Sequence, residues 1–286
     1  LWTKSSQQVS QIHCSHGDWG VVLMRVSVRG GSGLGDALYV QAVARFMVSR
    51  GDMVEVCCDW PDVFGQYSDD VLVVSPFRRM GVSVVAHYST RRGCSNTTQF
   101  EDCCISASIP RTAPLRLDWE PRASCERLRP FVLVAMAREP FARGDNYGIE
   151  LLPDCNAVQR VIDIVRRDYD VVQVGKGESL HAYSGLSEDL SNRQSVSELI
   201  DLASRASGMI GQMSYMIPLA ESLGKPGLFV WSRRGLSSKN EVLSRLTPRK
   251  VLHHTNSLCV VDDCTDEHMR DVADVFCREA GRREAA

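Results

Sequence analysis

Apolar residues recur along the chain with two different spacings, which is typical of a protein in which strands and helices alternate. Residues 21–28 (VVLMRVSV) form an apolar run that predicts a strand. After a glycine-rich turn, apolar residues return at helical spacing at Leu38, Ala42 and Phe46, and Gly51 marks the end of the helix. The first folded unit is therefore expected to begin with a strand, a turn and a helix.

The alternation continues through the first part of the chain. Candidate strands cover residues 54–58, 71–75 and 82–87, and a short helix or turn joins the first two. Residues 88–129 lose this periodicity and are rich in Ser, Thr, Pro and Arg. We expect them to form the irregular end of a first domain and a linker to the next one.

A second unit begins with the buried-strand pattern FVLVAMA at residue 131. Helices are expected at residues 154–167, 196–206, 215–223 and 265–278, and strands at residues 171–174, 208–211, 227–231, 251–253 and 259–262. This order predicts an α/β protein with two doubly wound, Rossmann-like sheets that face each other across a cleft. The predicted domains are residues 1–125 and 126–286, and the last helix is expected to pack near their boundary.

Length and composition fit two globular domains. The chain has 286 residues, of which 44% are hydrophobic and 24% are charged. Its net charge of −2 gives no general attraction to nucleic acid or to a membrane. No apolar run reaches the roughly 18 residues that a transmembrane helix needs, and the polar N-terminal segment has no signal-peptide core. These features predict a cytoplasmic protein without a membrane span.

The eleven cysteines are scattered or adjacent, and no two of them have CxxC spacing. The adjacent pairs at 57–58 and 103–104 would point to opposite faces of a strand, which suits packing better than pairing. Reduced thiols, and no metal, are therefore expected. The alternative is a zinc site built from Cys94, Cys103 and Cys104, or from His13, Cys14 and His16.

The glycine-rich turn, residues 29–38 (RGGSGLGDAL), carries the clearest chemical signal. Gly31, Gly33 and Gly35 allow backbone N–H groups to approach a phosphate or a sugar, and a helix N-terminus favours negative charge. Asp36 in the first helical turn is either an N-terminal cap or a catalytic base. The turn lacks both the Lys-Ser/Thr ending of a P-loop and the spacing of a dinucleotide fingerprint.

Three segments resemble, in the right order, the heptosyltransferase family (glycosyltransferase family 9), whose members have the GT-B fold. RGGSGLGDAL is similar to the family's N-terminal loop, whose Gly-Asp supplies the catalytic base, and this implies that role for Asp36. FVLVAMA, a helix and VVQVGKGE resemble the start of the family's nucleotide domain. This second resemblance implies that Gly175 and Glu178 lie near the donor nucleoside.

The third segment, residues 195–231 (SVSELIDLASRASGMIGQMSYMIPLAESLGKPGLFVW), resembles the family's donor-binding stretch. The family usually carries Asp-Ser/Thr-Gly at the donor turn and a His shortly after it. This chain has Met213, Ser214 and Tyr215 there, with Pro218 in place of the His. The resemblance implies donor contacts from Ser214 and Tyr215, and the missing Asp leaves the donor, and catalysis itself, open.

The resemblance implies a metal-independent, inverting transfer of a sugar from a nucleotide-sugar donor to a hydroxyl acceptor, without a cofactor. Arg138 and Arg143 follow the FVLVAMA strand, and a guanidinium group fits the oxygens of a diphosphate leaving group. The alternative for both arginines is ordinary surface charge.

The acceptor is expected to meet the first domain. Residues 76–129 contain nine arginines and five acidic residues, which suits an anionic acceptor unless these groups only pair with one another. Arg91 and Arg92 are the best candidates, and a bacterial surface glycan is the favoured acceptor. Two alternatives stay open: transfer to a modified nucleic-acid base, or a degenerate relative that binds a nucleotide or glycan without turnover.

Overall fold

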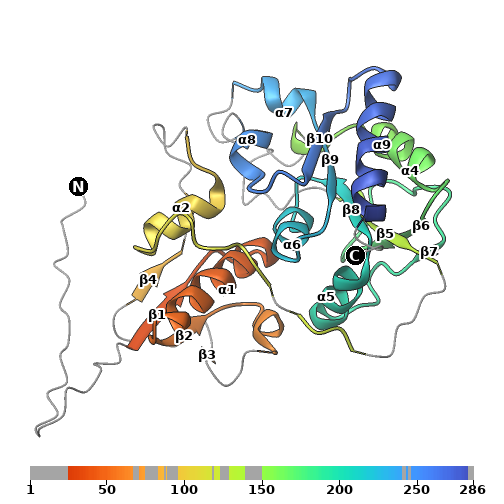
Figure 1. Ribbon diagram of the computed structural model, residues 1–286. Helices are drawn as coiled ribbons and strands as arrows, with labels where there is room; N and C mark the ends of the chain where they lie inside the picture. The colour runs from red at the N-terminus through yellow and green to blue at the C-terminus, as the bar shows by residue number, and fades with distance from the viewer. Residues whose placement is uncertain are drawn as a thin grey trace, which may run out of the picture.

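The computed structural model of the protein describes residues 25–66, 71–74, 83–86, 88, 96–117, 119–122, 129–138, 150–239, 243 and 246–282. Two parallel sheets follow one another along the chain, each with its own helices (Figure 1). This arrangement confirms the predicted fold class of two doubly wound, Rossmann-like sheets. The predicted boundary between residues 125 and 126 lies outside the described residues and stays a prediction.

The first sheet has four parallel strands in the order β3-β2-β1-β4. The elements of this unit are β1 (Arg25–Arg29), α1 (Leu34–Ser49), β2 (Met53–Cys57), η1 (Pro61–Phe64), β3 (Val71–Val74), β4 (Ser83–Val85) and α2 (Gln99–Ser106). The chain adds β2 and β3 on one side of β1 and then places β4 on the other side. The switch point of the sheet, where such folds bind ligands, therefore lies between β1 and β4.

The second sheet has six parallel strands in the order β10-β9-β8-β5-β6-β7. Its strands are β5 (Phe131–Ala135), β6 (Asp170–Val174), β7 (Glu188–Asp189), β8 (Gly208–Gln212), β9 (Gly227–Trp231) and β10 (Ser257–Val261). Its helices are α4 (Cys155–Val165), α5 (Val196–Arg205), α6 (Met216–Ser222), α7 (Arg233–Ser237), α8 (Pro248–Val251) and α9 (Asp266–Arg282). This is the strand order of dinucleotide-binding sheets, and its switch point lies between β5 and β8.

Two sequence predictions of local structure are wrong, and in both places the chain forms a short helix instead. The irregular segment 88–129 contains α2, which begins at a capping box in which Thr98 and Glu101 bond each other's backbone N–H groups. Cys103 and Cys104 therefore lie on a helix rather than on a strand, and both are buried. The strand expected at 251–253 is replaced by α8, which starts with Pro248 at its first position.

The last helix packs on elements of the second unit, and its expected position near the domain boundary stays a prediction because that boundary lies outside the described residues. The helix lies against α4 and against β9 and β10 of the second sheet (Figure 1). Its buried side chains are Met269, Ala273, Phe276 and Ala280, which recur at helical spacing along one face. Phe276 packs directly on Gly208, where an added Cβ would lie 2.6 Å from the ring. The apolar face of α9 is thus buried within the second unit.

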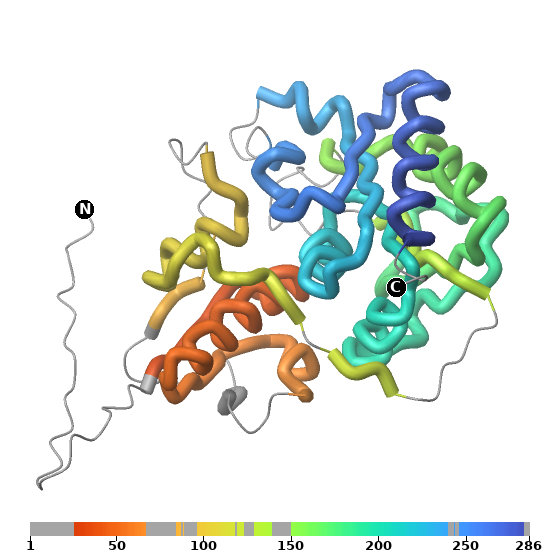
Figure 2. The backbone as a smooth tube through the Cα atoms, in the orientation of Figure 1, coloured from red at the N-terminus to blue at the C-terminus, as the bar shows by residue number. Residues whose placement is uncertain are grey.

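The two units meet along α1 and α6, which pack side by side (Figure 1). Most of α1 is buried, including Val43 and Ala44, because its own sheet covers one face and α6 lies on another. A strap formed by residues 114–117 and 119–122 runs beside this contact into the second unit (Figure 2). In the strap, the Leu117 N–H donates to the carbonyl oxygen of Ser222 over 2.7 Å.

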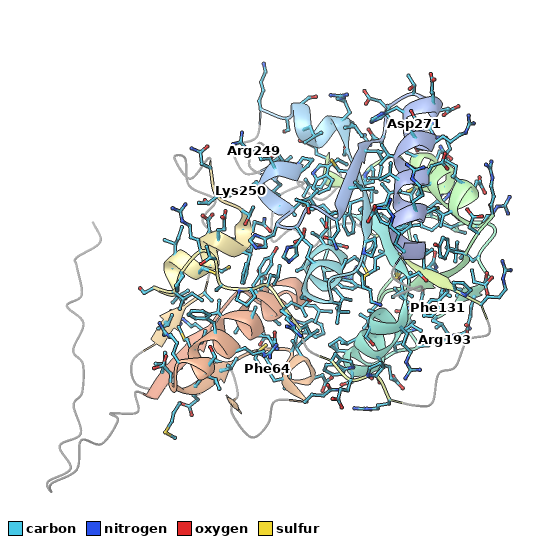
Figure 3. The ribbon with its side chains drawn as sticks, viewed as in Figure 1. Phe64, Phe131, Arg193, Arg249, Lys250 and Asp271 are labelled. Atoms are coloured by element: carbon cyan, nitrogen blue, oxygen red, sulfur yellow. The ribbon has the colours of Figure 1, made fainter. Side chains whose placement is uncertain are left out.

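A buried ion pair joins α2 of the first unit to α8 of the second. Lys250 Nζ lies 2.6 Å from Asp102 Oδ2, and the two side chains are only 12% and 4% exposed. Lys250 points toward α2 in Figure 3 and also donates to the carbonyl oxygen of Thr97 over 2.7 Å. Removing one partner of such a pair typically costs about 3–5 kcal/mol, because the other charge stays buried. The ion pair therefore disfavours separation of the units at this edge.

Glu221 at the end of α6 holds the segment that leads into β10. Its Oε1 atom accepts hydrogen bonds from the N–H groups of His253 (2.8 Å) and His254 (3.1 Å) and from the Ser257 hydroxyl (2.9 Å). Its Oε2 atom is buried and has no partner among the described residues. Burial raises the pKa of Glu221, although the three donors oppose the shift. The acceptor oxygen of Glu221 therefore contributes more to the stability of this segment than its negative charge does.

Glu221→Gln keeps that oxygen and removes the buried charge, so the free energy of unfolding at neutral pH should change by less than about 1 kcal/mol. Glu221→Ala leaves three donors without an acceptor and should cost about 3 kcal/mol. Because the pKa is raised in the folded protein, the contribution of Glu221 is complete below the pKa of an unfolded Glu. It is lost as the pH rises through the folded-state value.

Urea unfolding at a series of pH values measures both effects. The Gln variant should gain stability relative to the wild type as the pH rises above the ordinary pKa of Glu. Equal losses in the Gln and Ala variants would contradict this account, because they would show that the negative charge itself holds the segment.

Candidate functional site

The glycine-rich turn follows β1 at the switch point of the first sheet and leads into α1. Gly33 is the N-cap of α1, and its N–H donates to Asp36 Oδ2 over 3.0 Å. A Cβ at Gly31 would lie 2.4 Å from the same oxygen, so only glycine leaves room for the carboxylate. Asp36 is thus a cap of the helix in which it lies. A carboxylate has about four lone-pair sites, so the cap leaves capacity for a second role.

Trp60, which follows β2, holds the glycine-rich turn by a hydrogen bond. The indole N–H of Trp60 donates to the carbonyl oxygen of Ser32 over 2.9 Å, and the Trp60 N–H donates to Cys58 Sγ over 3.2 Å. Burial raises the pKa of Cys58 to about 11. Burial also raises the pKa of Cys103, and the negative charge of Asp36 adds to both shifts. Both thiols stay protonated at neutral pH and are therefore poor nucleophiles.

At the switch point of the second sheet, Arg138 follows β5 and lies against the loop after β6. Arg138 Nη1 donates to the carbonyl oxygen of Lys176 over 2.6 Å, and the Gln212 side-chain amide donates to the carbonyl oxygen of Arg138. A Cβ at Gly177 would lie 3.1 Å from the guanidinium carbon. The guanidinium group is therefore held at a fixed place in the crevice where such sheets bind ligands.

Asn192 shapes the loop that contains Gly175 and Glu178. Its side-chain amide accepts a hydrogen bond from the Gly177 N–H over 2.6 Å and donates to the Gly177 carbonyl oxygen over 3.0 Å. Gly175 and Gly177 have φ angles of 139° and 111°, which only glycine adopts readily. Glu178 follows them with an exposed side chain. The loop is thus rigid at its glycines and presents Glu178 to solvent.

The turn after β8 holds the other predicted donor residues. Ser214 Oγ accepts a hydrogen bond from the N–H of Met216, the first residue of α6, over 3.2 Å. The Tyr215 hydroxyl is buried and has no partner in the described part of the chain. Burial raises the pKa of Tyr215 to about 12, although the nearby charge of Arg138 opposes this shift. Tyr215 therefore lies within the electrostatic reach of Arg138.

The two crevices meet at Gly35. A Cβ at this position would lie 3.1 Å from the Pro218 ring and 3.5 Å from the Tyr215 Cα atom. The turn that contains Asp36 thus lies against the turn that contains Tyr215. The structure brings together the glycine turn, Asp36, Ser214, Tyr215 and Arg138. Arg91, Arg92 and Arg143 lie outside the described residues.

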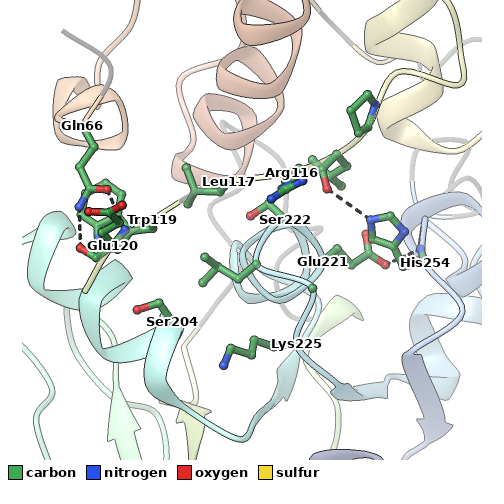
Figure 4. A pocket seen from close by; sticks show the side chains of 14 residues that line it. Gln66, Arg116, Leu117, Trp119, Glu120, Ser204, Glu221, Ser222, Lys225 and His254 are labelled. Atoms are coloured by element: carbon green, nitrogen blue, oxygen red, sulfur yellow. Dashed lines mark hydrogen bonds between the residues drawn. The ribbon is translucent and has the colours of Figure 1, made fainter. Parts of the chain in front are cut away.

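A groove of about 1210 Å³ opens at the other end of α6 (Figure 4). It is lined by the strap, by Glu221 in the last turn of α6, by Lys225 after that helix, and by His254. None of the described site residues predicted from the sequence lines it. The groove is therefore separate from the meeting point at Gly35, since Tyr215 precedes α6 and Glu221 lies in its last turn.

The described residues contain few other groups with catalytic or metal-binding chemistry. Their eight cysteines are free thiols, and no group of three or more His, Cys, Asp and Glu side chains there fits a metal ion. Of the predicted zinc ligands, Cys94, His13, Cys14 and His16 lie outside that part of the chain. Within it, no helix is long and apolar enough to cross a bilayer.

The close contact between Gly31 and Asp36 can be tested by a double-mutant cycle. Gly31→Ala should displace the carboxylate and break its bond to Gly33, which costs about 1 kcal/mol of cap stability. In an Asp36→Ala background this bond is already absent, so the same substitution should cost no cap energy. Urea unfolding of the four proteins should give a coupling energy of about 1 kcal/mol. A coupling near zero would show that the carboxylate is not held by this contact.

No protein-family model and no curated protein matches the chain. Several solved structures do match it. The bacterial glycosyltransferase TibC of enterotoxigenic E. coli has 14% identity and a TM-score of 0.60, over 91% of this chain and 76% of that chain. E. coli ADP-heptose lipopolysaccharide heptosyltransferase II has 12% identity and a TM-score of 0.60, over 92% of this chain and 100% of that chain. A glycosyltransferase family 9 protein of Veillonella parvula has 10% identity and a TM-score of 0.64, over 90% and 97%.

These likenesses confirm the resemblance found in the sequence at the level of the fold. The chain has a heptosyltransferase-like GT-B fold. At identities of 10–14%, the matches speak for the fold alone.

Proposed function

We propose that this protein is a glycosyltransferase that moves a sugar from a nucleotide-sugar donor to a hydroxyl group of a glycan. The observation that carries the proposal is the contact at Gly35, which joins the switch points of the two sheets. It places Gly35, the neighbour of Asp36 in the chain, against a turn whose Tyr215 senses the charge of Arg138. A base and a fixed cation on facing sheets are what sugar transfer to a hydroxyl requires.

In this proposal the acceptor oxygen attacks the anomeric carbon from the side opposite the diphosphate, and Asp36 accepts the hydroxyl proton as the new bond forms. The bond from that carbon to the diphosphate breaks, and the configuration inverts. The proton ends on Asp36, and the nucleoside diphosphate leaves with the bonding electrons. No metal ion and no cofactor take part.

Arg138 is the candidate for stabilising the leaving diphosphate. Its Nη1 atom is bonded to the Lys176 carbonyl oxygen, which fixes the plane of the guanidinium group. A guanidinium group has five N–H donors, so one such bond leaves others for phosphate oxygens. Arg143 follows in the same segment and is proposed to assist. Glu178, exposed beyond the glycines of the neighbouring loop, is proposed to contact the nucleoside.

Asp36→Asn tests the proposed base. The amide oxygen still accepts the Gly33 N–H, so folding should survive, while the rate of transfer should fall by about two to four orders of magnitude. The measurement is nucleoside diphosphate release from a panel of nucleotide sugars in the presence of glycan acceptors. Asp52→Asn, which removes the partner of Arg50 after α1, is the matched control and should keep its activity. Undiminished transfer by a stable Asp36→Asn protein would show that Asp36 is only a cap of helix α1.

The altered donor turn supports a donor that differs from that of the structural neighbours. TibC has been solved with ADP-heptose bound. In this chain Met213 replaces the family's Asp, and Tyr215 and Pro218 fill the space beside Gly35. We propose a donor with a larger apolar face, which the Tyr215 ring contacts. Because Tyr215 and Pro218 fill this space, a second candidate function is also favoured, in which the protein binds a nucleotide or glycan without turnover.

A thermal-shift panel of nucleotide sugars and nucleoside diphosphates separates these candidates. A changed donor should raise the melting temperature selectively, and Tyr215→Ala should abolish the rise because ring contact is worth about 1 kcal/mol beyond burial. Tyr215→Phe is the control and should keep the response, since the hydroxyl has no described partner. A response without any product would favour binding alone. No response to any nucleotide sugar or nucleoside diphosphate would contradict the proposed donor site.

A further inference from the structure

The topology of the first sheet places Tyr88 beside Asp36. Strands β1 and β4 are parallel neighbours with Arg29 opposite Val85, and the Ala86 N–H donates to the Arg29 carbonyl oxygen over 2.8 Å. The chain leaves β1 through the glycine turn and leaves β4 toward Tyr88. Both residues therefore lie at the carboxyl ends of the two strands that flank the switch point.

Tyr88 and Asp36 are in direct contact. The Tyr88 hydroxyl is hydrogen-bonded to the Asp36 carboxylate, which also accepts the Gly33 N–H over 3.0 Å. The Tyr88 ring stands edge-on to the buried Tyr39 ring, with centroids 6.4 Å apart and an interplanar angle of 85°. Tyr39 in turn lies 5.7 Å from the buried Phe100 ring. The phenol that meets the carboxylate is thus held by a packed aromatic row.

The charges around the contact keep Tyr88 protonated. Burial, the charge of Asp36 and the hydrogen bond to Asp36 all raise the pKa of Tyr88. Tyr39 on α1, Cys58 after β2 and Cys103 on α2 also sense the charge of Asp36. Burial raises the pKa of each of these three groups, so they too are neutral at pH 7. Tyr88 is therefore a hydrogen-bond donor to Asp36 across the working pH range.

We propose that Tyr88 is the positioning residue of Asp36. Its hydroxyl and the Gly33 N–H hold the carboxylate from two separate segments, so that a remaining lone pair faces the acceptor hydroxyl. Donation to the carboxylate also favours its ionised form, which is the form that accepts a proton. The phenol keeps its own proton throughout the transfer. This inference rests on the proposed role of Asp36 as the base.

Tyr88→Phe removes the donor and leaves the ring in place. The midpoint at which Asp36 takes up a proton should then move upward by about one pH unit, because a hydrogen bond to a charged group is worth about a tenfold change in proton affinity. The ¹³C carboxyl signal of Asp36, assigned by comparison with Asp36→Asn, reports this midpoint without any need for turnover. Tyr39→Phe is the matched control, since the Tyr39 hydroxyl is buried and has no described partner.

The proposal holds if the midpoint rises in Tyr88→Phe and stays in Tyr39→Phe, in proteins whose unfolding curves show them to be folded. With a competent donor and acceptor, the acid limb of the kcat profile should move to higher pH by the same amount, while KM for the donor stays unchanged. An unshifted midpoint in Tyr88→Phe, or equal shifts in both variants, overturns the proposal. A shifted midpoint in a protein that transfers no sugar leaves the contact established and overturns the proposed function instead.

Discussion

Gly35 allows the first turn of α1 to touch the first turn of α6, and the candidate site depends on this approach. A Cβ at Gly35 would lie 3.1 Å from the Pro218 ring, closer than most side-chain contacts, so a larger residue would push the two turns apart. Strands β1 and β8 both end at this contact, because each turn follows a strand at the switch point of its sheet. The two crevices thereby adjoin each other.

Buried polar groups away from the site fix the angle at which the units meet. The ion pair of Lys250 with Asp102 joins α8 to α2, and the strap bonds to the last residue of α6 through Leu117. Apolar packing of α1 on α6 is favourable over a range of orientations, whereas a buried charge pair is favourable only where both charges meet. The ion pair and the strap thus restrict the orientations that the apolar contact would allow.

The sequence predicted what depends on neighbours along the chain. Strands, most helices and the glycine turn were predictable because apolar spacing and glycines act locally. Helix α2 was missed although Thr98 and Glu101 form a capping box, because the surrounding Ser, Thr and Pro residues concealed it. Tyr88 was missed for a different reason: it reaches Asp36 only through the pairing of β4 with β1. No local pattern records such a contact. The roles proposed for Asp36 and Tyr215 came from a family resemblance, and that of Arg138 came from the chemistry of its guanidinium group.

The proposed function gives one carboxylate two uses, as a helix cap and as a base, and the groups that cap it also lower its affinity for a proton. A helix N-terminus, the Gly33 N–H and the Tyr88 hydroxyl all stabilise the charged form of Asp36 and make it a weak base. Such a base does not deprotonate a free sugar hydroxyl, whose proton is held far more tightly. It accepts the proton once the acceptor oxygen has begun to bond to the anomeric carbon, because that oxygen becomes acidic as the bond forms. In the proposed reaction, therefore, proton transfer follows bond formation, and what the structure must supply first is the alignment of the two sheets.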